Sequence, residues 1–204
     1  MTDISEELDE QTIDREPINQ FKRWFEDAVA SGMKLPEAMT LATATRDGKP
    51  SARVVLLKGV DSDGFVFYTN YRSAKARDLE ANPHAALVFY WSQFDRQVRV
   101  EGTVERVSTE ESRAYFKTRP RESQIGAWAS PQSNVIENRE VLEARVAELE
   151  QLYGDGELEC PEHWGGYRVK PTRIEFWKGR LGRLHDRIVY ERDGTHWNIN
   201  RLAP

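Results

Sequence analysis

A short aliphatic stretch in the first third of the chain carries a positive charge at each end. Positions 54–57 are Val-Val-Leu-Leu and lie between Arg53 and Lys58, with Asp-Gly turn signals on both sides. Such a run predicts a strand buried on both faces, whose terminal cations must reach solvent or meet an anion. Strict alternation directs positions 53 and 58 to opposite faces, so one ligand touching both requires a bulge or a strand end. The stretch is a candidate anion-binding element, and cations that simply reach solvent are the alternative.

Three further clusters of cationic and polar residues could complete such a site. The tract 119–124, Arg-Pro-Arg-Glu-Ser-Gln, follows a helical pattern that carries Tyr115, and the tract 132–134, Gln-Ser-Asn, supplies amides and a hydroxyl. The tract 183–187, Arg-Leu-His-Asp-Arg, puts its two arginines and its histidine on one face of a predicted strand. Three such groups in a row repel one another unless an anion or acid intervenes. Taken singly, each cluster is a weak signal and is better explained by an exposed, solvated face.

Other chemistries lack the residues that they need. No Ser-His-Asp or Cys-His set can be assembled from the spacing, and no metal-ligand spacing is present. The single cysteine, Cys160, excludes an internal disulfide and a cysteine-built metal site. No Gly-x-Gly-x-x-Gly follows a predicted strand and no phosphate-loop lysine motif occurs, which argues against nucleotide folds of those types.

Composition is that of an ordinary globular protein. The 204 residues are 39% hydrophobic and 31% charged, enough for one domain with a sizeable core. Residues 1–16 hold seven acidic residues and one arginine, which gives this segment a charge of −6. Since the whole chain has a net charge of −5, residues 17–204, the body of the protein, carry +1. We expect a flexible acidic leader over 1–16 and one domain over 17–204. The nearly neutral body argues against nucleic acid, and the lack of a long apolar run or signal peptide predicts no membrane span and a cytoplasmic location.

The order of the predicted elements indicates a mainly β protein with flanking helices. Seven or eight mostly antiparallel strands at hairpin spacing are typical of a closed or split barrel. We predict helices over 17–29, 73–81, 110–117 and 139–153, and strands over 39–45, 51–58, 65–69, 85–91, 97–107, 167–177, 184–192 and 196–202.

Seven tracts and the C-terminal ending occur in the order found in one known family. From about residue 17 to the last residue, the sequence resembles the pyridoxamine 5′-phosphate oxidase family, whose members use FMN. The matching tracts are Arg53–Lys58, Phe67–Asn70, Arg96–Val98, Arg119–Trp128, Trp164–Tyr167, Glu175–Trp177, Arg183–Arg187 and the ending Arg201–Pro204. The resemblance implies an antiparallel FMN-binding split β-barrel that forms a homodimer with FMN at the subunit interface.

The resemblance also implies a function and a set of site residues. The expected reaction oxidises pyridoxamine 5′-phosphate or pyridoxine 5′-phosphate to pyridoxal 5′-phosphate and reduces O2 to H2O2, with hydride passing from C4′ of the substrate to flavin N5. Expected FMN contacts are Arg53, Val54, Val55, Leu56, Leu57, Lys58, Tyr68, Thr69, Lys75, Gln97, Gln132, Ser133, Trp177 and Arg187. Expected substrate contacts are Lys58, Tyr115, Arg119, Ser123, Arg183, Leu184 and His185, of which Arg183 and His185 are the expected catalytic residues.

The sequence departs from the family pattern at two points. The family has Ser-Arg-Lys where this chain has Ser73-Ala74-Lys75, so one arginine expected at the flavin phosphate is absent, and Arg72 is a candidate replacement. The arginine and tyrosine that many relatives carry near the N-terminus are not recognisable here. Two other functions remain alternatives: a related flavin oxidase of the phenazine-biosynthesis type, and a non-enzymatic protein that binds flavin or pyridoxal phosphate.

Overall fold

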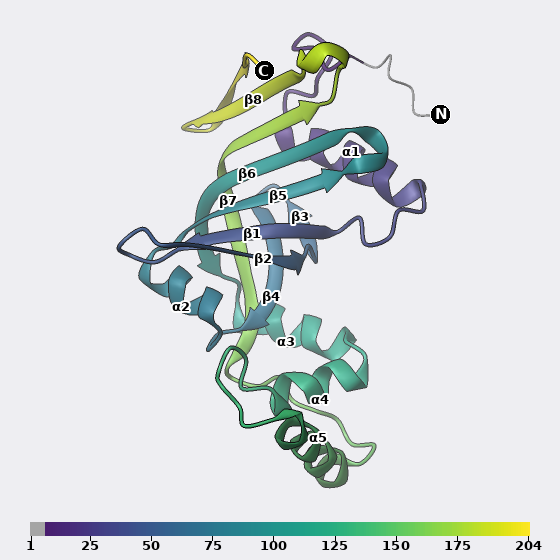
Figure 1. Cartoon of the computed structure of the whole chain (residues 1–204), viewed down its shortest axis with the longest axis vertical. Helices are drawn as coiled ribbons and strands as arrows, with labels where there is room; N and C mark the ends of the chain where they lie inside the picture. Colours follow the sequence, from purple (N-terminus) through teal and green to yellow (C-terminus); the bar gives the residue numbers. More distant parts are fainter. Residues whose placement is uncertain (1–6) are drawn as a thin grey trace.

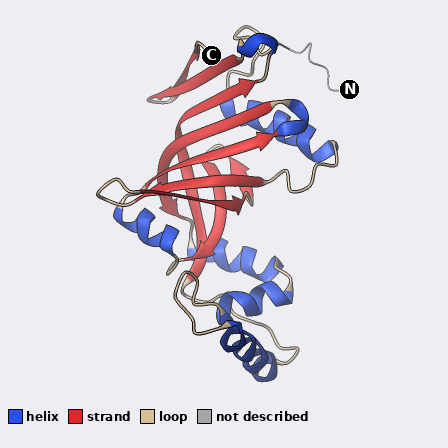
Figure 2. Cartoon of the chain, viewed as in Figure 1, coloured by secondary structure: helices blue, strands red, loops and turns tan. Residues whose placement is uncertain are grey.

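One curled antiparallel sheet forms the body of the protein. The structure, a computed structural model, describes residues 7–204. Seven of the nine strands in the described residues lie in the order β2-β1-β5-β6-β7-β4-β3, and the other two branch off, with β8 paired to β7 and β9 paired to β8 (Figures 1 and 2). This confirms the predicted split barrel, with the short strand β3 as an addition to those expected. The strands are β1 (Ala38–Ala44), β2 (Pro50–Leu56), β3 (Gly59–Asp61), β4 (Gly64–Asn70), β5 (His84–Trp91), β6 (Arg96–Arg106), β7 (Trp164–Lys178), β8 (Asp186–Asp193) and β9 (His196–Arg201).

Five helices flank the sheet in the described part of the chain. Three of them, α3, α4 and α5, gather at the end of the molecule opposite β8 and β9 (Figure 1). None of the helices over residues 7–204 has the length and apolarity needed to cross a membrane. The helices are α1 (Pro17–Ala30), α2 (Ala74–Ala81), α3 (Thr109–Thr118), α4 (Arg121–Ala129) and α5 (Arg139–Tyr153).

Helix α1 closes the barrel core with aromatic side chains. Pro17 starts the helix in its first turn, and the 3.6-residue spacing of apolar residues turns one face toward the sheet. Phe21 is fully buried, and its ring meets those of Phe65 and Phe89 edge-on, each at 4.9 Å between centroids. Trp24 packs edge-on against Phe176 at 5.2 Å. Removing a buried phenylalanine ring of this kind costs about 3–5 kcal/mol, so α1 is a part of the core.

A bulge bends the two longest strands and lets them reach both ends of the molecule. The register of β6 against β7 shifts between Glu101 and Gly102. A Cβ atom on Gly102 would lie 2.0 Å from the carbonyl oxygen of Lys170, so only glycine allows the backbones to come this close. Strand β7 begins at Trp164, at the end of the molecule that holds α3, α4 and α5, and passes the bulge on its way to the other end.

The helices at that end enclose a second, smaller core. Phe116, Ile125, Leu149 and Trp164 are buried in it. Helix α5 has the predicted bounds, and its Leu149 is buried while its Leu152 is exposed. Helix α4 was not predicted. Its sequence follows Arg-Pro and mixes charged, small and aromatic residues, so apolar residues do not recur at the 3.6-residue spacing that would predict a helix.

The central aliphatic strand differs from its prediction in length and burial. Strand β2 ends at Leu56, and its residues are exposed or half-buried, with Val54 67% exposed. The prediction of a strand buried on both faces is therefore wrong for a single chain, because β2 is an edge strand paired only with β1. Lys58 lies just past the strand end, which meets the condition under which it and Arg53 can face one ligand.

The tract 183–187 is not one strand face. Gly182 and Arg183 adopt left-handed backbone angles, with φ of +67° and +62°, and β8 begins only at Asp186. Two left-handed residues in succession cannot continue an extended strand. The predicted alignment of Arg183, His185 and Arg187 on one face is thus wrong: the first two lie in a turn and the third lies on the strand.

The N-terminal segment packs on the body from residue 8 onward. Leu8 and Ile13 are buried in the barrel core. The hydroxyl of Tyr190 donates to the backbone oxygen of Asp14 at 2.6 Å, and Arg201 forms an ion pair with Glu10 at 2.7 Å. The expectation of an unpacked leader is therefore wrong for residues 8–14, since two apolar residues and several hydrogen bonds hold this stretch. Residues 1–6 of the expected leader lie outside the described residues.

Candidate functional site

A cavity of about 490 Å³ lies beside the edge strand β2 and faces the helical end. Its volume falls within the range of small-molecule sites, roughly 300–1,000 Å³. The predicted site residues that line it are Arg53, Val54, Val55, Leu56, Lys58, Tyr68, Thr69, Lys75, Tyr115, Arg119, Ser123 and Gln132. Four of them are cations, and no carboxylate is among the lining residues of this cavity. An unbalanced group of cations around a cavity is suited to an anionic ligand.

Two cations form one end of the cavity, next to the start of α2. Lys75 Nζ donates to Thr69 Oγ1 at 3.1 Å and to Gln132 Oε1 at 3.0 Å. Arg53 donates to Thr43 Oγ1 at 2.8 Å and to Ser51 Oγ at 2.6 Å. Burial, and then repulsion by Arg53, lowers the pKa of Lys75. The hydrogen-bond partners of Lys75 are neutral, so its charge remains available to a ligand, whereas Arg53 also lies 3.9 Å from the carboxylate of Asp78.

The loop before α2 fixes these residues. Asn70 ends β4, and its Nδ2 donates to the backbone oxygen of Ser130 at 3.3 Å, which ties the strand end to the loop after α4. Ser73 then caps α2 by accepting from the backbone nitrogen of Ala76. Because Ser73 is the cap and α2 starts at Ala74, Lys75 lies in the first turn of the helix, beside the cavity.

Stacked aromatic rings and a third cation form the other end. The ring of Tyr68 stacks on those of Tyr115 and Trp164, with centroids 3.9 and 5.4 Å away, and the centroids of these two rings are 6.3 Å apart. The guanidinium of Arg119 lies over the Trp164 ring at 4.6 Å. Burial raises the pKa of Tyr68 to about 12, so its hydroxyl stays protonated at neutral pH. These rings and the cation suit a ligand that combines an aromatic ring with an anionic group.

Arg119 has unused hydrogen-bonding capacity. Its Nη1 atom is buried and has no hydrogen-bond partner among residues 7–204. The backbone of Arg119 is fixed, because Gln124 Nε2 donates to its carbonyl oxygen at 3.0 Å and the next residue, Pro120, is the N-cap of α4. A buried, unsatisfied guanidinium nitrogen costs free energy unless a ligand accepts from it. This observation fits an anionic substrate or cofactor in the cavity.

A second cluster holds most of the predicted site residues that the cavity lacks. Gln97, Trp177 and Arg187 are neighbours across β6, β7 and β8, in register with one another. The ring of His185 lies 4.7 Å from that of Trp177, and Arg183 and Leu184 are exposed in the same turn. The second cluster thus consists of Gln97, Trp177, Arg183, Leu184, His185 and Arg187.

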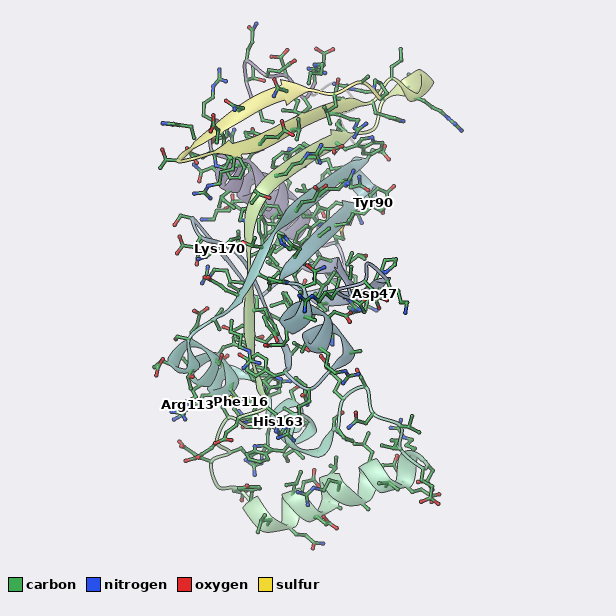
Figure 3. All side chains as sticks on the ribbon, turned by 90° about the vertical axis from the view of Figure 1, so that its left-hand side faces the viewer. Asp47, Tyr90, Arg113, Phe116, His163 and Lys170 are labelled. Carbon is green, nitrogen blue, oxygen red and sulfur yellow. The ribbon has the colours of Figure 1, made fainter. Side chains whose placement is uncertain are left out.

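The two groups lie at opposite ends of strand β7. Trp164 belongs to the cavity and Trp177 to the second cluster, and these positions are roughly 40 Å apart along an extended strand. Figure 3 shows the same separation: Tyr90, the strand partner of Gln97, lies in the upper half, and Phe116, which packs on Trp164, lies in the lower half. A single small ligand therefore cannot contact both groups of one chain.

Two predicted residues belong to neither group. Leu57 is buried in the barrel core and does not line the cavity, and Ser133 is exposed beside Gln132 with a left-handed φ of +69°. The cavity also has lining residues that were not predicted as contacts: Asn70, Gly126, Ala127, Ser130 and Trp164. All but Ser130 lay in tracts already matched to the family, so the signal for them was present. Ser130 gave none.

Family comparisons cover both groups of residues. Residues 25–153 match the family described as pyridoxamine 5′-phosphate oxidase. Residues 164–204 match the region described as the pyridoxine 5′-phosphate oxidase C-terminal dimerisation region. All of the second cluster except Gln97 lies within this second match.

Individual relatives resemble the chain along nearly its whole length. A pyridoxine/pyridoxamine 5′-phosphate oxidase of Rubrobacter xylanophilus is 60% identical over 197 residues, which cover 97% of this chain and 91% of the relative. One of Burkholderia vietnamiensis is 55% identical, over 97% of this chain and 93% of the relative.

Solved structures share the fold. PhzG from Burkholderia lata 383, crystallised in complex with tetrahydrophenazine-1-carboxylic acid, superposes with a TM-score of 0.92 at 34% identity, covering 98% of each chain. A pyridoxamine 5′-phosphate oxidase-related, FMN-binding protein of Nostoc punctiforme superposes with a TM-score of 0.73 over 90% of this chain and 97% of its own, at 18% identity. Because one family spans most of the sequence, and relatives more than half identical run along nearly all of it, the chain belongs to the pyridoxamine 5′-phosphate oxidase family.

Proposed function

We propose that this chain is an FMN-dependent oxidase that converts pyridoxamine 5′-phosphate or pyridoxine 5′-phosphate to pyridoxal 5′-phosphate and reduces O2 to H2O2. The observation that carries the proposal is the 60% identity to a pyridoxine/pyridoxamine 5′-phosphate oxidase over 97% of the chain. The geometry agrees with it, since a cavity with four cations and no lining carboxylate suits ligands that carry phosphate.

FMN fits the end of the cavity that holds Arg53 and Lys75. We expect these two cations to hold the flavin phosphate, with Thr69 and Gln132 orienting Lys75 through their hydrogen bonds. The backbone of the edge strand β2, whose outer edge has no strand partner in a single chain, can supply further donors and acceptors to a flat ring. When bound, FMN would take up a hydride from the substrate and allow O2 to be reduced.

The substrate fits the end that holds Arg119 and the stacked aromatic rings. We expect Arg119 and Lys58 to bind the substrate phosphate, with Ser123 and the hydroxyl of Tyr115 as neutral donors. The unsatisfied Nη1 of Arg119 would then gain its acceptor. Since the cofactor carries the redox chemistry, these residues need only bind and orient the substrate and exclude water, which explains why no nucleophile–base pair was found.

A second copy of the chain would complete the site. The second cluster cannot reach the cavity of its own chain, and nearly all of it lies in the region that matches a dimerisation region. We therefore expect a homodimer in which Trp177 and Arg187 of one subunit contact the FMN held by the other. Arg183 and His185 of the same subunit would contact the substrate there. Leu181 and Leu184 beside them are exposed in one chain. They suit an interface, because neighbouring apolar side chains exposed at a turn gain free energy when a partner buries them.

The competing function is oxidation of a different acidic ring, because the phenazine-related PhzG structure has the same fold. The lower identity to PhzG, 34% against 60%, favours the vitamin substrate. The test is to purify the protein, record its flavin absorbance, and measure H2O2 release under air with pyridoxamine 5′-phosphate, pyridoxine 5′-phosphate and tetrahydrophenazine-1-carboxylic acid. Turnover of either B6 phosphate well above the phenazine substrate supports the proposal. The reverse order, or a protein without flavin, contradicts it.

A further inference from the structure

The turn between β7 and β8 must hold two expected substrate residues in place with little packing of its own. It contains Arg183 and His185, and its backbone is left-handed at Gly182 and Arg183. Leu181 and Leu184, which flank Arg183, are 86% and 73% exposed in one chain. Side chains that contact substrate need support from neighbours to keep a productive geometry.

Asp186, the first residue of β8, makes hydrogen bonds from its carboxylate to three separate parts of the chain. One oxygen accepts from Arg180 Nε at 2.6 Å and from the backbone nitrogen of Leu8 at 3.4 Å. The other accepts from Arg201 Nη1 at 2.9 Å. Burial alone would raise the pKa of Asp186, but the hydrogen bonds from Arg180 and Arg201 outweigh it and lower the pKa below its usual value. The carboxylate is therefore charged at neutral pH.

Arg180 links this carboxylate to His185. It precedes the turn, and Asp186 follows it, so their ion pair closes the turn at its base. The backbone nitrogen of Arg180 donates to Nδ1 of His185 at 3.1 Å. A backbone amide can only donate, so Nδ1 must be the nitrogen without a proton. The proton of the neutral ring then lies on Nε2, which leaves Nε2–H as a donor.

We propose that Asp186 is a positioning residue for the substrate: by holding Arg180 across the base of the turn, it fixes the ring of His185 with the proton on Nε2. The inference rests on the proposed function, because it takes His185 as a substrate contact. The fixed Nε2–H is suited to an acceptor atom on the substrate. The ring of Trp177 lies 4.7 Å from that of His185 and limits how far the imidazole can swing toward β7.

A double-mutant cycle tests the route through His185. Asp186→Asn keeps the size of the side chain and removes its charge. We expect this variant to stay dimeric and to retain flavin, with kcat/KM lowered about tenfold. In a His185→Ala background the same substitution should cost less than about twofold, because the residue that Asp186 positions is gone. Asp193→Asn, an exposed aspartate on the same strand, is the matched control and should have no effect. Equal losses in both backgrounds would overturn the proposal.

A measurement without turnover tests the same inference independently. The chain has four histidines, so selective ¹⁵N-histidine labelling with His185→Ala as the assignment control can identify the His185 signals. We expect the proton on Nε2 in the wild-type protein and a mixture of tautomers in Asp186→Asn. If Asp186→Asn fails to fold, Arg180→Gln removes the same ion pair and should give the same mixture. A wild-type His185 protonated on Nδ1, or a tautomer unchanged in both variants, would overturn the proposal. Absence of oxidase activity would instead count against the proposed function, since the tautomer does not depend on turnover.

Discussion

The carboxylate of Glu175 accepts a hydrogen bond from Nε of Arg187 at 2.8 Å while being only 2% exposed. Arg99 and Arg173 lie 3.5 Å from its other oxygen, so one buried carboxylate faces three guanidinium groups on β6, β7 and β8. Arg187 also donates to the backbone oxygen of Ala203 at 3.0 Å, which ties it to the C-terminal end of the chain. Glu175 and the backbone of Ala203 therefore hold in place the side chain of Arg187, the expected FMN contact.

Glu175→Gln should weaken FMN binding without removing an FMN contact. The amide keeps the shape of the side chain but removes the carboxylate that pairs with Arg187, while Arg99 and Arg173 keep Glu101, each at 3.1 Å, so Arg187 is held less firmly. We expect the unfolding free energy to fall by about 1–3 kcal/mol and FMN to dissociate more readily. Flavin absorbance after gel filtration and urea unfolding measure the two effects. Glu191→Gln, an exposed carboxylate 3.7 Å from Arg173, is the control and should change neither. Full flavin retention in Glu175→Gln would show that Arg187 needs no support.

Arg119→Ala should lower activity while leaving the protein yellow. The substitution removes the guanidinium whose buried Nη1 has no partner among residues 7–204, and with it one charge-assisted contact to the substrate phosphate. A loss of roughly 1.5–3 kcal/mol corresponds to a ten- to hundredfold decrease in kcat/KM. Arg119→Lys should recover only part, because an ammonium neither stacks on Trp164 as a plane nor binds in a bidentate manner. Arg113→Ala, an exposed arginine on α3, serves as the control. Steady-state H2O2 release measures kcat/KM, and flavin absorbance measures the FMN content of each variant. Loss of flavin in Arg119→Ala would assign this arginine to the cofactor instead of the substrate.

Ala74→Arg should tighten FMN binding. Ala74 is the exposed first residue of α2 and adjoins Lys75, whereas Arg72 lines a different cavity together with Trp128. Arg72 is not among the residues that line the cavity of Lys75. One added charge-assisted hydrogen bond of roughly 1 kcal/mol would lower Kd about fivefold, with a small loss of stability from a cation at a helix N-terminus. Fluorescence titration of the apoprotein with FMN measures it. If Arg72→Ala weakens FMN binding and Ala74→Arg has no effect, Arg72 fills the role of the absent arginine. If neither substitution has an effect, the flavin phosphate lies elsewhere.

The Glu10–Arg201 ion pair should make part of the stability depend on pH. The hydrogen bond from Arg201 lowers the pKa of Glu10 from 4.5 to about 2. A carboxylate with a lowered pKa stabilises the fold fully above pH 4.5 and loses this contribution as the pH falls toward about 2. The contribution is below about 1 kcal/mol, because both side chains are close to 40% exposed.

Urea unfolding of the wild type and of Glu10→Gln at a series of pH values measures this contribution. The difference between them should be constant near neutrality and shrink below pH 4.5, while Glu7→Gln, an exposed carboxylate of the same segment, should follow the wild type. A difference that grows on acidification would contradict the assignment.

Local patterns predicted the elements better than their burial or their assembly. Helix α5 was predicted with its observed bounds and the helix after Ser73 to within one residue of them, because the signals for a helix act over short stretches of the chain. Strand β2 was predicted as buried because an aliphatic run does not reveal whether a neighbouring strand lies on both sides. Docking of Leu8 and Ile13 was missed, since two apolar residues in an acidic segment find their partners only in the folded body.

The site residues were predicted as one set, but the fold divides them. Arg53, Lys58 and Arg119 meet in one cavity, which follows from tracts that flank the same end of the sheet. Arg183 and Arg187 lie at the far end of β7, and nothing in their spacing could reveal the length of the strand between the groups. The left-handed turn at Gly182 and Arg183 was likewise invisible to an alternation rule, because Arg183 is not a residue type that favours such angles.

A mixed-dimer assay tests most directly the central claim that two chains build one active site. Arg119→Ala removes a residue of the cavity and Arg183→Ala removes one of the second cluster, so each homodimer should have low activity. Co-expressing the two variants with different affinity tags and purifying through both tags isolates the heterodimer. In it, one site carries both substitutions and the other carries none, so H2O2 release with pyridoxamine 5′-phosphate should recover to about half of the wild-type value per dimer. A heterodimer no more active than the two parent homodimers would contradict the claim, because it would mean that each chain supplies both groups to its own site.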